Sequence, residues 1–205
     1  MEKNRGIIIL YEDLCDDWIR WLREARLNTL GVHKIAVPGS GSVDALLADL
    51  SHSDGRRYIE RAQDAGITVE YELHAMEWLM PRSNFADHPD WFRENEKGER
   101  TPDLNMCPSS AAGLETLSEN AYKLAKALAQ QSHKYYFWFD DAMGGACECE
   151  HCRNISAPDK YLTLLSAILR GLRAYDSKAM LSYLAYASMT ETPTKKPDDG
   201  IFLEF

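Results

Sequence analysis

The sequence predicts an α/β protein with a (β/α)8 TIM-barrel-like fold, incomplete at about six β/α units. Two observations predict this fold. Short apolar runs alternate with helical patterns along the chain, which is typical of a parallel sheet with right-handed crossovers. Polar side chains follow several predicted strands, at the edge of the sheet where such barrels carry their sites. An open doubly wound sheet is the alternative, but no glycine-rich phosphate loop follows the first strand.

The predicted strands are short runs that are rich in aliphatic, β-branched and aromatic residues. Isoleucine dominates the first strand, and five aromatic residues stand in succession in the fourth. In chain order, strands are expected at residues 6–11, 28–33, 67–74, 135–141, 180–186 and 200–205.

Helices are predicted between these strands, where apolar residues recur at helical spacing. Gly66 is expected to cap the C-terminus of one helix, and Ser109 and Ser110 can cap the start of another. Residues 34–53 are rich in turn-forming residues and are expected to form a loop-like excursion with a short helix at 43–50. The full helices are expected at residues 13–26 and 55–65, at 110–128, and at 159–174.

Residues 1–205 are expected to form a single, partial TIM-barrel domain of the catalytic type, because the chain is too short for two independent cores. Residues 77–107 form a long loop insertion. Its aromatic residues favour an ordered lid or a wall of a binding site over a disordered segment. A partial barrel leaves an unpaired sheet edge, so we expect self-association at that edge or a C-terminal continuation past Phe205.

Composition excludes two classes of partner. The formal net charge is −9 and no block of lysine and arginine is present, so nucleic acid is not an expected partner. The longest apolar run, residues 6–11, is far too short to cross a membrane and lacks the features of a signal peptide. The chain as it stands is therefore expected to be cytoplasmic, unless a secreted form has lost its signal.

Two adjacent carboxylates, Asp140 and Asp141, end the aromatic strand. Close carboxylates resist simultaneous ionisation, so one of them keeps its proton near neutral pH, as an acid catalyst requires. A structural role is the alternative, in which Asp140 caps a turn and Asp141 pairs with a nearby base.

The five cysteines are unevenly distributed, and an odd number fits a disulfide scaffold poorly. Four of them can supply the thiolates of a tetrahedral structural zinc site that joins two loops. His151 can replace one ligand, and free thiols packed against Met143 or a disulfide to Cys107 are the alternatives. The predicted metal ligands are Cys107, Cys147, Cys149 and Cys152.

Several stretches resemble the glycoside-hydrolase-like barrels of domain of unknown function family 4838. They are YYFWFDDAMGGACECEHC, VEYELHAMEWLMPRSNF, NMCPSS and DGIFLEF, and the resemblance covers most of the chain. More distantly, the chain is similar to the β-N-acetylhexosaminidases of glycoside hydrolase families 20 and 84. The resemblance implies a glycoside hydrolase that acts on N-acetylated or related sugars. The alternative is a non-catalytic carbohydrate-binding TIM-barrel domain.

In the hexosaminidase families the acetamido group of the substrate assists catalysis, with retention of configuration. By resemblance, Asp140 would orient that acetamide, and Asp141 would be the general acid and then the base that activates water. No organic cofactor is implied. Residues expected to bind the sugar stand at strand ends or offer an aromatic face, with Trp138 as a further aromatic candidate. The predicted substrate-binding residues are His33, His74, Trp78, Tyr186 and Glu204.

Overall fold

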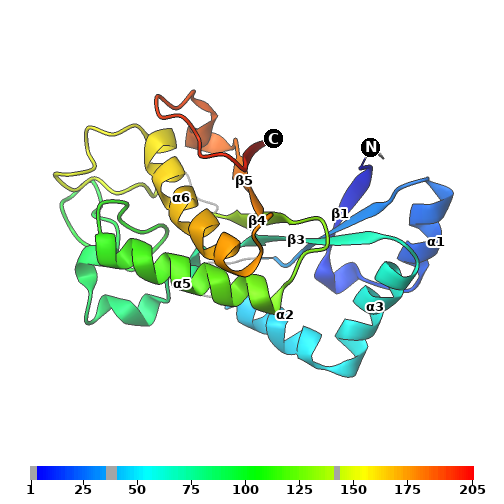
Figure 1. The fold of residues 1–205 in the computed structure, drawn as a ribbon. Helices are drawn as coiled ribbons and strands as arrows, with labels where there is room; N and C mark the ends of the chain where they lie inside the picture. Colours follow the sequence, from blue (N-terminus) through cyan, green and yellow to red (C-terminus); the bar gives the residue numbers. More distant parts are fainter. Residues whose placement is uncertain (1–3, 36–40, 141–143) are drawn as a thin grey trace.

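The structure is a computed structural model that describes residues 4–35, 41–140 and 144–205. Its centre is a parallel six-stranded sheet in which the strands follow their order in the sequence (Figure 1). A doubly wound sheet reverses its strand order near the middle, so the sequential order excludes that alternative and confirms the barrel-like class. The strands are β1 (Gly6–Leu10), β2 (Thr29–His33), β3 (Thr68–His74), β4 (Lys134–Trp138), β5 (Met180–Leu184) and β6 (Ile201–Glu204).

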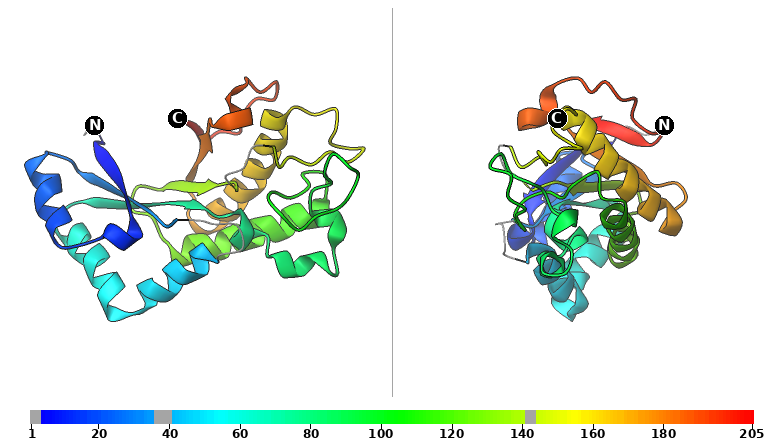
Figure 2. Two further views of the ribbon diagram at one scale, coloured as in Figure 1. Left: turned by 180° about the vertical axis from the view of Figure 1, so that it is seen from behind. Right: turned by 90° about the vertical axis from the view of Figure 1, so that its left-hand side faces the viewer.

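At least one α-helix lies between each pair of successive strands from β1 to β5, whereas a short 3-10 helix at Ala187–Thr190 lies between β5 and β6. Helices α5 and α6 lie side by side against the sheet (Figures 1 and 2). Side-chain caps start both: Ser110 accepts from the backbone of Gly113, and Ser156 accepts from that of Asp159. The excursion predicted at 34–53 carries a longer helix than expected, α2, and α1 is shorter than its predicted range. The helices are α1 (Asp17–Glu24), α2 (Ser42–Ser51), α3 (Ser53–Asp64), α4 (Met76–Leu79), α5 (Ala111–Ala127) and α6 (Ala157–Tyr175).

Alternate residues of a strand face opposite sides of the sheet, and β3 shows both sides. Val69, Tyr71 and Leu73 belong to the buried apolar core, which also contains the inner faces of α5 and α6. Glu70 and Glu72 lie between them in the sequence and face the other, concave side. The core therefore lies between the sheet and the helices, and the concave side carries polar groups.

The sheet is strongly curved, because side chains of β4 and β6 meet although β5 separates these strands. The rings of Tyr136 and Phe202 are in edge contact, with centroids 5.5 Å apart. One layer further along, Trp138 Nε1 donates a hydrogen bond of 2.9 Å to Glu204 Oε2. This curvature brings the carboxyl ends of the strands around a common face, here called the mouth.

The insertion at 77–107 is ordered, as its aromatic residues predicted, and its buried residues are continuous with the main hydrophobic core. Phe92 and Met106 form an isolated antiparallel bridge and are fully buried. Short 3-10 helices lie at Arg82–Phe85 and Pro89–Trp91.

Among the described residues, none of the helices has the length and apolar character needed to cross a membrane. Ile8 of β1 and Leu203 of β6, the two outer strands of the sheet, are exposed. Self-association or a further segment that covers this edge stays a prediction.

Candidate active site

Four side chains from β2, β3, β4 and β6 meet at the mouth. The ring of Trp138 lies 5.7 Å from that of His33 and 5.3 Å from that of His74, measured between centroids. Glu204 accepts the indole N–H of Trp138. The structure thus places His33, His74 and Glu204 together, as their positions at strand ends predicted, while their roles in binding stay a prediction.

Both histidines are oriented by backbone carbonyl groups. His33 Nδ1 donates to the carbonyl oxygen of Glu72 at 2.7 Å, and His74 Nδ1 donates to that of Phe139 at 2.5 Å. A ring that donates through Nδ1 has Nε2 as its acceptor when the imidazole is neutral. Each histidine therefore offers an acceptor in a fixed orientation, which suits recognition of a hydroxyl group.

Asp140 follows β4 and lies in a small cavity of about 40 Å³ that His74 and Tyr186 also line. Its carboxylate forms an ion pair with Arg82, at 2.5 Å from Nη2, and its backbone N–H donates to Asn105 Oδ1 at 3.3 Å. Burial raises the pKa of the Asp140 carboxyl, and the Arg82 guanidinium acts in the opposite direction. Asp140 thus pairs with a base, where the structural alternative expected a turn cap. Asp141 lies outside the described residues.

The sequence did not single out Arg82 or Asn105 as site residues. Both lie in the insertion, far along the chain from Asp140, and loop residues carry no periodic pattern that reveals a partner. The available signal was that Arg82 and Asn105 lie within two of the stretches that resemble the barrel family. Arg82 Nη1 is buried without a hydrogen-bond partner, so this guanidinium has an unused donor beside the mouth.

Glutamates on the concave face form an unexpected acidic layer below the mouth. Glu70 and Glu72 are almost fully buried, and Tyr136 donates a hydrogen bond of 3.0 Å to Glu70 Oε2. Burial, followed by repulsion from Glu204 and Glu70, raises the pKa of Glu72 to about 8. A side chain at Gly31 would collide with the Glu72 carboxyl group, which explains a glycine inside β2. The alternation of apolar and acidic residues in β3 was the signal for this layer.

Replacement of Glu72 by glutamine is expected to stabilise the protein more at pH 8 than at pH 5. The carboxyl ionises near 4.5 when unfolded and near 8 when folded, so its protonated form favours folding and that contribution falls as pH rises between these values. Glutamine does not titrate, so the difference in free energy of unfolding between the variant and the wild type should grow by at most about 1.4 kcal/mol per pH unit. Thermal unfolding at both pH values measures this difference, with the exposed Glu119→Gln as control. A difference independent of pH would contradict the expectation.

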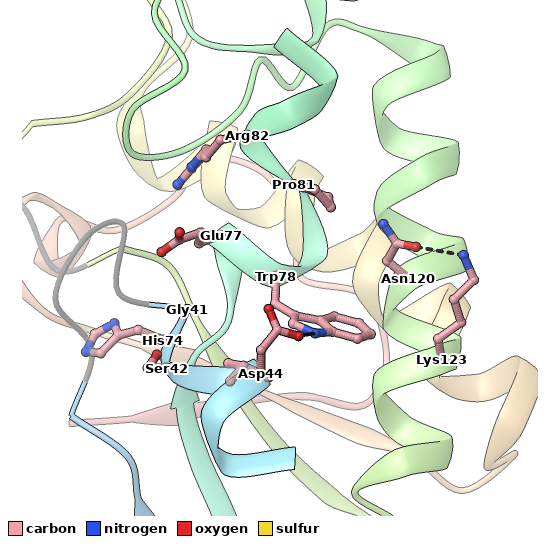
Figure 3. Close-up of a pocket in the computed structure, with 11 residues that line it drawn as sticks. Gly41, Ser42, Asp44, His74, Glu77, Trp78, Pro81, Arg82, Asn120 and Lys123 are labelled. Carbon is pink, nitrogen blue, oxygen red and sulfur yellow. Dashed lines mark hydrogen bonds between the residues drawn. The ribbon is translucent and has the colours of Figure 1, made fainter. Parts of the chain in front are cut away.

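Trp78 lies in a second, larger cavity next to the mouth (Figure 3). This cavity has a volume of about 340 Å³, and His74 lines both it and the small cavity of Asp140. The indole Nε1 of Trp78 donates to Asp44 Oδ1 at 2.8 Å, which fixes the orientation of the ring. Trp78 therefore shares a cavity with His74. The ring contacts at the mouth, by contrast, are those of Trp138 with His33 and His74.

Four buried cysteines form a cluster that joins the segments after β3 and β4. Their sulfur atoms all lie within 4.8 Å of one another, so the cluster can hold a metal ion. Cys107 Sγ lies 3.8 Å from the sulfurs of both Cys149 and Cys152, far beyond the length of a disulfide bond. All of these cysteines are free, which rules out the disulfide alternative. The cluster comprises Cys107, Cys147, Cys149 and Cys152.

Positive charge and hydrogen-bond donors surround these sulfurs. Arg100 Nη1 lies 3.7 Å from Cys147 Sγ, and the backbone N–H of Glu94 donates to the same sulfur at 3.3 Å. The hydrogen bond with Cys107, together with burial, raises the pKa of the Cys147 thiol although the Glu94 N–H acts in the opposite direction. The hydrogen bond from Cys147 lowers the pKa of Cys107 to about 4, so the thiolate of this pair lies at Cys107. His151 does not join the cluster: its side chain is 71% exposed and lies beside Glu150. The suggestion that His151 replaces a cysteine ligand is therefore wrong.

Comparisons with known proteins agree with this architecture. The model of the family described as "Domain of unknown function (DUF4838)" matches residues 47–205. No curated protein matches the chain. A β-galactosidase from Rahnella sp. R3 superposes with a TM-score of 0.53 and 13% identity, over 88% of this chain and 35% of that chain. A β-galactosidase from Bacillus circulans sp. alkalophilus superposes with a TM-score of 0.53 and 12% identity, over 87% of this chain and 36% of that chain. The chain thus spans about a third of either enzyme, and the likeness shows the fold.

Proposed function

This chain belongs to the DUF4838 family of domains of unknown function, and we propose that it is a glycoside hydrolase that acts on N-acetylated or related sugars. The small cavity at Asp140 is the observation that carries the proposal. Its volume of about 40 Å³ suits a substituent such as an acetamido group better than a whole sugar ring. Phe139, Tyr161 and Leu184 give it apolar walls, and the carboxylate of Asp140 gives it a polar end.

In this proposal the two aspartates have different roles. Asp140 accepts the acetamide N–H and orients the acetamide oxygen toward the anomeric carbon, while Arg82 keeps the carboxylate in place. Asp141 protonates the leaving oxygen and then removes a proton from water. His33 and His74 accept hydrogen bonds from sugar hydroxyl groups through Nε2. The substrate supplies the nucleophile, so configuration is retained.

Because the structural neighbours are β-galactosidases, galactosides should be tested as substrates as well. A galactoside has no acetamido group that could act as the nucleophile. Such a substrate would require a second carboxylate at the mouth. Glu204 is the candidate, since it stands at the end of β6 and accepts a hydrogen bond from Trp138 at the mouth. Turnover of galactosides without turnover of N-acetylglucosaminides would therefore move the nucleophilic role to a protein side chain.

A carbohydrate-binding domain without activity is the second candidate function. One observation favours it: Arg82 already neutralises Asp140, so this carboxylate is held in an ion pair before any substrate arrives. The two candidates share the sugar site and differ in whether a proton is transferred there.

We expect the protein to release 4-nitrophenol from 4-nitrophenyl β-N-acetylglucosaminide, because the histidines at the mouth can accept hydrogen bonds from sugar hydroxyl groups beside the carboxylate of Asp140. Initial rates on aryl glycosides of N-acetylglucosamine, N-acetylgalactosamine, galactose and glucose measure both activity and sugar preference. Asp140→Asn should abolish the preference for acetamido sugars. Sugar binding by calorimetry without turnover would support the carbohydrate-binding function, and the absence of both would contradict the proposal.

We propose that the four cysteines bind structural zinc. Sulfur ligands about 2.3 Å from a tetrahedral zinc ion lie about 3.8 Å apart, and Cys107 Sγ lies 3.8 Å from both Cys149 Sγ and Cys152 Sγ. Four thiolates leave no position for water, so this metal would stabilise the fold and take no part in hydrolysis. It would tie the insertion, including Asn105, to the segment that carries Asp140.

A further inference from the structure

The larger cavity beside the mouth has no role in the chemistry described above, and we propose that it binds a neighbouring sugar unit of an oligosaccharide substrate. This inference rests on the proposed function. His74 lines both cavities, and Arg82 lines the larger one while it forms the ion pair with Asp140 (Figure 3). The two cavities therefore share a wall. A glycan held at Asp140 therefore has the larger cavity beside it, on the other side of His74 and Arg82.

The lining of the larger cavity suits a pyranose ring. Trp78 presents an aromatic ring, and its bond to Asp44 keeps that ring in one orientation. Asn120 and Lys123 on α5 line the cavity beyond Trp78, where Lys123 Nζ donates to Asn120 Oδ1 at 2.9 Å (Figure 3). A pyranose has apolar C–H faces and a rim of hydroxyl groups, so it can lie against an aromatic ring while polar groups bind its rim.

Charge and size narrow the class of ligand. Asp44 and Glu77 carry negative charge, and Arg82 and Lys123 carry positive charge, so the formal charges of the lining cancel. A balanced lining favours a neutral sugar over a uronic acid or a sulfated sugar, which would require excess positive charge. The volume of about 340 Å³ is near the lower end of the range of about 300 to 1,000 Å³ for small-molecule sites. A single neutral sugar unit fits these limits.

Calorimetric titration tests the inference with two matched pairs of probes. The pairs are N-acetylglucosamine with N,N′-diacetylchitobiose, and galactose with β-1,4-galactobiose. At least one disaccharide should bind about tenfold more tightly than its monosaccharide, since hydrogen bonds to charged groups add binding energy of that order. Lys123→Ala should remove most of this gain and leave the monosaccharide affinity unchanged. Lys126→Ala, an exposed change on the same helix, should alter neither affinity.

The possible results separate this inference from the function on which it rests. Equal affinities for a monosaccharide and its disaccharide would overturn the second sugar site and leave the proposed function standing. A gain in affinity that survives both Lys123→Ala and Trp78→Phe, in variants with unchanged thermal unfolding, would place the second unit elsewhere and also overturn the inference. Failure of all four sugars to bind would overturn both proposals.

Discussion

Replacement of Asp141 by asparagine is expected to lower kcat for an aryl glycoside with a poor leaving group by about 10² to 10⁴-fold, the usual contribution of a general acid. Asparagine occupies nearly the same volume but cannot protonate the leaving oxygen. With a 2,4-dinitrophenyl leaving group, which departs without protonation, the loss in the first step should be much smaller. Initial rates on the two substrates measure this difference.

Two control variants show whether the effect belongs to the acid. Asp87→Asn changes an exposed aspartate of the insertion and should leave both rates unaltered. Asp140→Asn should lower the rates with both leaving groups, because orientation of the acetamide precedes departure of either group. Equal losses for the two leaving groups in Asp141→Asn, or no loss, would remove Asp141 from the role of acid.

Replacement of Cys107 by serine is expected to destabilise the protein by at least about 3 kcal/mol and to lower Tm by roughly 6 to 12 °C. A structural metal contributes its binding energy to folding, and loss of one thiolate weakens its binding strongly. Cys107 also carries the contact between the segments after β3 and β4, since its sulfur touches those of Cys149 and Cys152. Scanning calorimetry, together with metal analysis of the purified protein, measures both quantities.

Cys15→Ser is the matched control, because Cys15 is free and lies outside the cluster. It should change neither Tm nor metal content. A strong chelator should lower the Tm of the wild-type protein toward that of Cys107→Ser and have no further effect on the variant. Purified protein that contains no metal and is indifferent to the chelator would refute the zinc site.

The barrel order could be predicted because it depends on local patterns. The apolar runs that became β1 to β6 are separated by helical stretches, and consecutive parallel strands joined by right-handed crossovers usually pair in sequence. The same rule brought His33, His74 and Glu204 to one face, since each stands at the end of its strand. The cysteine cluster followed from the spacing of Cys147, Cys149 and Cys152.

Other parts of the site depend on contacts between distant residues. Arg82 pairs with Asp140 across a separation of 58 residues, and Trp78 lies in a separate cavity because Asp44 of α2 holds its indole. No periodicity encodes such pairs. The acidic layer at Glu70 and Glu72 was visible as an alternation in β3, but its burial depends on the curvature of the whole sheet.

The most direct test of the proposed sugar site is diffraction from crystals of the protein soaked with methyl β-N-acetylglucosaminide. We predict density for the acetamido group in the small cavity beside Asp140, with ring hydroxyl groups within hydrogen-bond distance of His33 or His74. A sugar bound away from Asp140, or an empty mouth in a protein that binds the sugar in solution, would contradict the assignment of this site.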